Sequence, residues 1–111
     1  MASEHIDAVA DIAVAANRRF TEAHPHAATQ VGVISSTIRA MGIAADAVNI
    51  DCLRSGRRLV LILLDRIPGT VGIGIGQKDT VGQYELLGQV DVTALHEDAV
   101  LAILEERFVL D

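Results

Sequence analysis

The chain has 111 residues, of which 50% are hydrophobic and only 3% aromatic, and its formal net charge at neutral pH is −6. This length suits one hydrophobic core, so we expect a single domain over residues 1–111. The acidic balance argues against binding to nucleic acid or to an anionic membrane, because both depend on clustered Lys and Arg.

Two consecutive helices are predicted at the N-terminal end. Apolar residues recur at steps of three and four between residues 6 and 20, after Ser3 as the N-cap, which predicts a helix that ends near residue 23. Pro25 suits the first turn of a helix, so a second helix is expected from there to Gly42, which can adopt the left-handed conformation of a C-terminal cap. The heptad-like spacing of both apolar stripes predicts an αα-hairpin.

Beyond residue 47 the apolar pattern changes to the period of two that is typical of strands. Turn-forming segments divide this region into four predicted strands, near residues 47–54, 58–65, 70–77 and 82–91. Their connections are too short for a parallel crossover, so an antiparallel meander in chain order is expected.

A final helix is predicted after the strands, with Thr93 as its N-cap and its end near Phe108. The resulting order is ααββββα. Because helices and strands are segregated along the chain, the pattern predicts a two-layer α+β domain in which the helices cover one face of a four-stranded sheet.

The strand predicted over residues 70–77 alternates between branched residues and glycines. Its period of two places Gly72, Gly74 and Gly76 together on one face and the branched residues on the other, toward the helices. Glycine weakens a strand and offers nothing to pack, so we expect a compensating reason for this bare face.

Other strands are expected to contribute residues to the same face. Its predicted members on the outer strands are Asn49, Asp51, Leu53, Glu85, Leu87 and Gln89. The strand near 58–65 is apolar on both faces, which is typical of a strand that is covered on both sides. Since the helices cover one side only, we predict that a second copy of the chain covers the other, as a symmetric homodimer, or that a partner protein or small ligand does so. The alternative is that a helix or residues 109–110 of the same chain fold over the glycines.

The glycine alternation does not predict a phosphate site, because a turn and another strand follow it where a nucleotide-binding loop needs a helix. His24 and His26 are close enough in sequence to share a metal ion, but two ligands do not make a site, and a polar turn is expected there. We therefore predict no metal and no cofactor.

Two further groups of residues are candidates for chemistry. Asp51 and Glu85 are candidates for an acid/base pair if they meet on the glycine-bearing face, whereas the favoured interpretation is a pair of solvated carboxylates at the sheet margin. Arg54, Arg57 and Arg58 surround the first strand turn and are candidates for contact with an anionic ligand or acidic partner. The alternative is a solvated basic turn.

Three features concern the compartment. Cys52, the single cysteine, cannot form an intramolecular disulfide and is expected to be a buried, unreactive thiol. No export signal is visible near the N-terminus, and the longest apolar run, residues 59–64, is too short to span a membrane. These features predict a cytoplasmic protein.

The absence of a complete catalytic set favours a non-enzymatic function. We predict a homodimeric protein-interaction or ligand-binding module that uses the glycine-bearing face. The alternative is a small enzyme or metal-binding protein with a site at the subunit interface, built from Asp51, Glu85, Tyr84 or the histidines.

Overall fold

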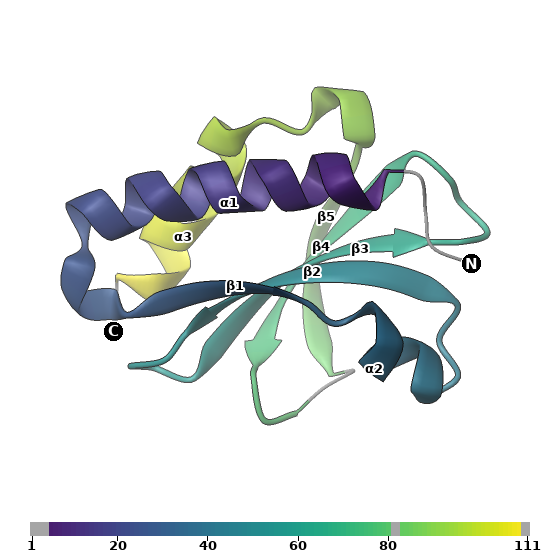
Figure 1. Ribbon diagram of the computed structural model, residues 1–111, viewed down its shortest axis with the longest axis horizontal. Coiled ribbons are helices and arrows are strands. Elements are labelled where there is room, and N and C mark those ends of the chain that lie inside the picture. The colour runs from purple at the N-terminus through teal and green to yellow at the C-terminus, as the bar shows by residue number, and fades with distance from the viewer. Residues whose placement is uncertain (1–4, 81–82, 110–111) are drawn as a thin grey trace.

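The computed structural model describes residues 5–80 and 83–109, and within them the chain forms one five-stranded antiparallel sheet with helices packed on it (Figure 1). The helices are α1 (Ile6–Ala23), α2 (Ser35–Ala40) and α3 (Glu97–Phe108), and the two 3₁₀ turns are η1 (Pro25–Ala27) and η2 (Val92–Ala94). The strands are β1 (Thr29–Val33), β2 (Ala45–Cys52), β3 (Arg57–Leu64), β4 (Thr70–Gln77) and β5 (Tyr84–Asp91). Neighbouring strands follow chain order from β1 to β5, which confirms the α+β class and the antiparallel meander.

The main core lies between the sheet and the pair α1 and α3, which pack beside each other above it (Figure 1). The buried stripe of α1 consists of Val9, Ala13, Ala16 and Phe20. Its small residues let the helix approach the sheet closely, as expected of a chain so poor in aromatic residues. At the far end of the helix, the rings of Phe20 and Phe108 meet edge to face at 6.1 Å and join α1 to α3.

The prediction of a second helix over residues 25–42, and with it the αα-hairpin, is wrong. Residues 29–33 form β1, which pairs with β2 and gives the sheet its fifth strand. The helical spacing was misleading because Val31 packs against the main core in the strand, as it would in a helix. Thr29 and Val33 flank it at alternate positions, and β-branched residues favour a strand.

Part of that helical prediction survives in α2, which occupies only six residues. Gly42 adopts a φ of +88° just after α2, and its N–H group donates to the carbonyl of Arg39 at 3.0 Å. The predicted left-handed glycine cap is therefore confirmed. The predicted N-cap of the first helix, Ser3, lies outside the described residues.

The C-terminal part matches the prediction more closely. Helix α3 ends at Phe108 as predicted, but Thr93 is not its N-cap. Thr93 lies in η2, where its N–H group donates to Asp91 Oδ1 at 2.9 Å, and α3 begins only at Glu97. Among the described helices, none has the length and apolar character needed to cross a membrane.

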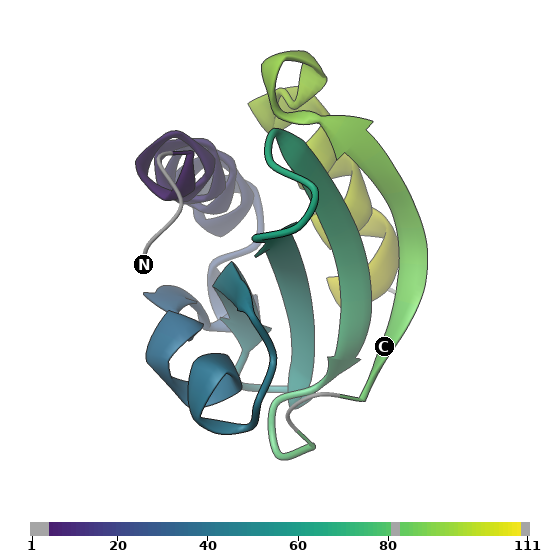
Figure 2. The same cartoon turned by 90° about the vertical axis from the view of Figure 1, so that its right-hand side faces the viewer.

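Helix α2 lies apart from the other two helices, on the opposite face of the sheet (Figure 2). Its Ile38 is 3% exposed and forms a second, smaller core with Ala45, Ala47 and Val60. The expectation that all helices share one face is thus corrected, because α2 covers the β2 and β3 part of the other face.

Candidate functional site

The face of the sheet opposite α1 and α3 is called the glycine face. Cross-strand pairing determines which residues share it, in three successive rows: Arg58, Gly76 and Tyr84; Val60, Gly74 and Leu86; Ile62, Gly72 and Gln89. The three glycines therefore lie side by side with residues of β3 and β5, as the alternation predicted.

Glu85 and Leu87 were predicted on the glycine face, and both placements are wrong. Glu85 pairs with Ile75, whose side chain lies toward the helices, and Leu87 packs against the main core. The cause is a register shift in the β4–β5 ladder beside Gly74, which changes the phase of alternation along β5. Gln89, beyond the shift, does lie opposite Gly72 as predicted.

Leu53 is also misplaced by the prediction, because β2 ends one residue earlier, at Cys52. Leu53 lies in the following turn, is 46% exposed, and donates its N–H group to the carbonyl of Ala28 at 3.0 Å. It is therefore not part of the glycine face.

Asp51 and Arg58 form an ion pair on the glycine face. The Arg58 Nε and Nη2 groups donate to the two oxygens of Asp51 at 2.7 and 2.9 Å, and the side chains of Arg58 and Asp51 are only 11% and 7% exposed, respectively. Hydrogen bonding to Asp51 raises the pKa of Arg58. Asp51 thus binds a guanidinium and lies on the other face from Glu85, so the two candidates do not form an acid/base pair. The favoured interpretation, two solvated carboxylates at the sheet margin, is wrong for Asp51, which is only 5% exposed.

Tyr84 covers two of the three glycines. A Cβ atom on Gly76 would lie 2.6 Å from Tyr84 Cδ1 and 2.8 Å from the Gln83 carbonyl, and one on Gly74 would lie 3.1 Å from Tyr84 Cβ. The absence of side chains at these positions allows the tyrosine to lie across the sheet beside Arg58. This part of the face is therefore sheltered by the chain itself.

Gly32 on β1 likewise makes room for a side chain of the neighbouring strand, β2. A Cβ atom on Gly32 would lie 3.0 Å from Asn49 Oδ1, so the glycine makes room for the asparagine amide. Asn49 is 4% exposed, and among the described residues its Oδ1 atom has no hydrogen-bond partner.

Around Gly72 the glycine face is open. A groove of about 200 Å³ runs along the sheet here and is called the Gly72 groove; it is lined by Ile62, Leu64, Ile67, Thr70, Gly72, Leu86 and Gln89. A Cβ atom on Gly72 would meet nothing nearer than the Ile62 carbonyl at 3.8 Å, and Leu86 is 63% exposed beside it. Leu86 was missed by the sequence analysis, although Gly88 in the same strand was a usable signal, because glycine inside a strand often marks a bulge.

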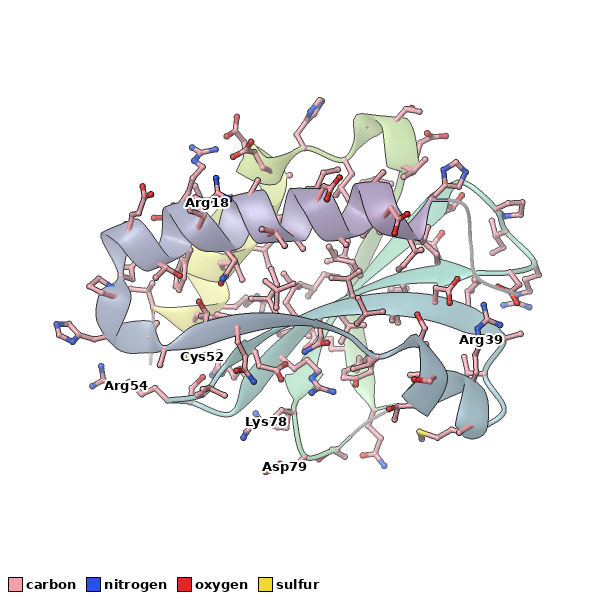
Figure 3. All side chains as sticks on the ribbon, viewed as in Figure 1. Arg18, Arg39, Cys52, Arg54, Lys78 and Asp79 are labelled. Atoms are coloured by element: carbon pink, nitrogen blue, oxygen red, sulfur yellow. The ribbon has the colours of Figure 1, made fainter. Side chains whose placement is uncertain are left out.

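The three arginines of the first strand turn do not form one patch. Arg58 pairs with Asp51, as described, and the Arg57 Nη1 group donates to the carbonyl of Arg107 at 2.8 Å, at the end of α3. Arg54 is exposed in the β2–β3 turn (Figure 3). Among the described residues, no hydrogen bond or ion pair engages the Arg54 side chain.

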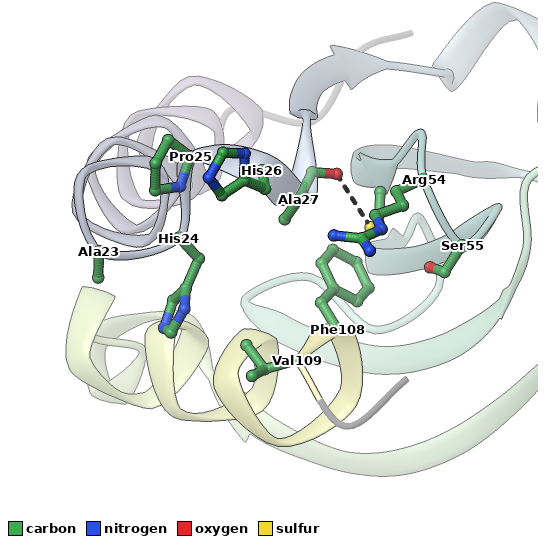
Figure 4. A pocket seen from close by; sticks show the side chains of 10 residues that line it. Ala23, His24, Pro25, His26, Ala27, Arg54, Ser55, Phe108 and Val109 are labelled. Atoms are coloured by element: carbon green, nitrogen blue, oxygen red, sulfur yellow. Dashed lines mark hydrogen bonds between the residues drawn. The ribbon is translucent and has the colours of Figure 1, made fainter.

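A second cavity, of about 380 Å³, lies where the end of α1, η1, the β2–β3 turn and the end of α3 meet (Figure 4). This Arg54 pocket is lined by Ala23, His24, Pro25, His26, Ala27, Cys52, Arg54, Ser55, Phe108 and Val109. Val109 thus lies at this pocket and does not cover the glycines. Cys52 is buried as predicted, and its thiol donates to the Ala27 carbonyl at 3.2 Å.

Both histidines of the predicted polar turn border the Arg54 pocket. His24 packs against Phe20, with ring centroids 4.8 Å apart, and its Nε2 atom lies 3.2 Å from Glu105 Oε2. Within residues 5–80 and 83–109, no three His, Cys, Asp or Glu side chains converge in a way that could hold a metal ion.

Comparisons with protein-family models, with curated proteins and with solved structures find no significant match to this chain.

Proposed function

We propose that the chain is a self-associating binding module in which the Gly72 groove of one copy meets the Gly72 groove of a second. The observation that supports this most directly is Leu86, a large apolar side chain that is 63% exposed beside the groove. Leu86 does not stand alone, because Ile62, Leu64 and Ile67 line the same groove and Ile67 is itself 38% exposed. Contiguous exposed apolar residues, unlike single ones, mark contacts with partners. A cytoplasmic location, where a buried lone cysteine stays reduced, belongs to the same proposal.

The shape of the patch favours a second copy as the partner. Leu86 on β5 leans toward Gly72 on the adjacent β4, with its Cδ1 atom 4.0 Å from the position that a Cβ atom on this glycine would take, so the exposed leucine forms a rim of the groove. A two-fold axis through the groove brings the two Leu86 side chains together across the interface. Dimers with such an isologous contact are the commonest homo-oligomers.

The net charge of the chain also favours contact between two copies at the Gly72 groove. Each chain carries a net charge of −6, so two copies repel each other over most of their surfaces. In the part of the chain that the structure describes, no charged side chain lines the Gly72 groove. Two copies can therefore meet there without bringing like charges together.

The test compares the solution mass of three proteins by size exclusion with light scattering at micromolar concentration. The wild type should have twice the chain mass of 11.8 kDa. Leu86→Ser removes two buried leucines from a symmetric contact, at about 3 kcal/mol in total, and should weaken dimerisation roughly a hundredfold.

Val14→Ser is the matched control, since Val14 is 45% exposed on α1, on the other side of the sheet. This variant should keep the wild-type mass. A wild type that elutes as a single chain, or a Val14→Ser variant that dissociates as readily as Leu86→Ser, contradicts the proposal.

A further inference from the structure

The Arg54 pocket combines an apolar wall with a polar edge. The apolar wall is formed where the C-terminal ends of α1 and α3 meet η1. Its residues are Ala23 at the end of α1, Pro25 and Ala27 in η1, and Phe108 and Val109 at the end of α3. Its volume of about 380 Å³ lies at the lower end of the range typical of small-molecule sites. A compact organic body can therefore be held there by apolar contacts.

The polar edge offers hydrogen-bond donors. Arg54 and Ser55, in the β2–β3 turn, and His26, in η1, contribute polar groups to the lining (Figure 4). Ser55 Oγ accepts from the Arg57 N–H group at 3.3 Å, so its hydroxyl proton is available to a ligand. The guanidinium of Arg54, with no protein partner among the described residues, has all of its donors available.

The Arg54 pocket is lined by a basic residue, although the net charge of the chain is −6. The chain has 15 acidic residues, yet among residues 5–80 and 83–109 no Asp or Glu lines the pocket. Glu105 contacts a lining residue from outside the pocket, with its Oε2 atom 3.2 Å from His24 Nε2. The pocket thus presents a fixed positive charge on an acidic protein.

We propose that the Arg54 pocket binds a small organic carboxylate. The apolar body of the ligand rests against Phe108 and Val109, and its carboxylate accepts hydrogen bonds from the Arg54 guanidinium and the Ser55 hydroxyl. A guanidinium matches a carboxylate in a two-pronged geometry, and a charge-assisted pair of this kind is stronger than a neutral hydrogen bond. The proposal is independent of dimerisation, because the pocket involves the helical layer and the Gly72 groove lies on the other face.

Titration of ¹⁵N-labelled protein with octanoate, followed by NMR, tests the proposal. Octanoate should shift the amide signals of His26, Arg54, Ser55 and Val109, and should bind at least tenfold more tightly than octan-1-ol, which lacks the charge, or acetate, which lacks the body. Arg54→Gln should remove the tenfold advantage of octanoate over octan-1-ol, because the charge-assisted bonds are lost.

Arg66→Gln is the matched control, since it removes the same charge from an exposed turn that does not line this pocket. It should leave octanoate binding unchanged, and so should Leu86→Ser, whatever its oligomeric state. Equal affinity for octanoate and octan-1-ol, unchanged binding by Arg54→Gln, or signal shifts confined to the Gly72 groove would each overturn the proposal.

Discussion

At the scale of single residues, the glycines of β4 differ in what lies above them. A Cβ atom on Gly76 would lie too close to the ring of Tyr84 and the Gln83 carbonyl, whereas one on Gly72 would make only ordinary contacts, with the Ile62 carbonyl at 3.8 Å and Leu86 Cδ1 at 4.0 Å. The same residue type thus serves close packing at one position and an open groove two rows away.

This difference predicts opposite effects for two alanine substitutions. Gly76→Ala should lower the free energy of unfolding by about 2 kcal/mol, because the backbone carbonyl of Gln83 cannot move aside as a flexible side chain can. Gly72→Ala should leave it unchanged or raise it by about 0.5 kcal/mol, because alanine loses less backbone entropy in a strand. Urea denaturation of both variants, as monomers on the Leu86→Ser background, measures this, and equal effects at the two positions would contradict it.

At the scale of secondary-structure elements, the ion pair of Asp51 and Arg58 links β2 to β3 at a place where both side chains are nearly buried. Replacing only Arg58 with Met leaves the Asp51 carboxylate poorly solvated, and we expect a loss of about 3 kcal/mol in the free energy of unfolding. The double variant Asp51→Leu with Arg58→Met removes both charges and should regain most of that loss. Arg54→Met, in the exposed turn, should change stability by less than about 0.5 kcal/mol. Urea unfolding of the four proteins gives the comparison, and a double variant no more stable than Arg58→Met would refute it.

The strands differ in how well the sequence predicts them. Strands β2 to β5 were predicted within about two residues of their bounds, because turn residues separate them clearly. Strand β1 was missed, since Val31 satisfies both the helical and the strand period and only its pairing with Ile50 decides between them. A local pattern cannot reveal a partner that lies some twenty residues further along the chain.

The candidate site was predicted to a smaller extent. The shared face of Gly72, Gly74 and Gly76 followed from alternation alone. Tyr84, which covers Gly74 and Gly76, and Leu86, which is exposed beside Gly72, were not predicted there. Both lie on this face because of the register shift in the β4–β5 ladder, whereas strict alternation from Glu85 places them on the other face. The Arg54 pocket was not foreseen, because it is assembled from segments that are distant in sequence.

At the scale of the whole molecule, Arg39 fastens α2 to the sheet at the end opposite Arg54 (Figure 3). Its Nη1 and Nη2 groups donate to Asp65 at 2.8 and 2.9 Å, and its Nε group lies 3.3 Å from Asp46 Oδ1. Hydrogen bonding to Arg39 lowers the pKa of Asp65 below its ordinary value. The folded protein therefore binds the Asp65 proton less readily than the unfolded chain does.

This pKa shift predicts a dependence of stability on pH. The contribution of Asp65 is fully present above the ordinary aspartate pKa of about 4 and is lost as the pH falls through the lower, folded-state value. Arg39→Gln should thus reduce the fall in Tm between neutral pH and about pH 3. The decrease should persist in part, because the pKa values of Asp91 and Asp98 are also lowered, by Thr93 and Arg19. Arg66→Gln is the control of equal charge, and an identical pH profile for wild type and Arg39→Gln would contradict the prediction.

The pairing of α1 with α3 has a consequence for synthesis on the ribosome. The Arg19 Nη1 group donates to Glu97 Oε2 at 3.1 Å although the two residues are 78 positions apart in the sequence. Phe20 of α1 likewise packs against Phe108 of α3. The ribosome synthesises strands β1 to β5 before α3. The apolar face of α1 that packs against α3 therefore has no partner until α3 has been made. A nascent polypeptide stalled ahead of α3 would expose this surface to chaperones, and the folding of the domain must wait for its last helix.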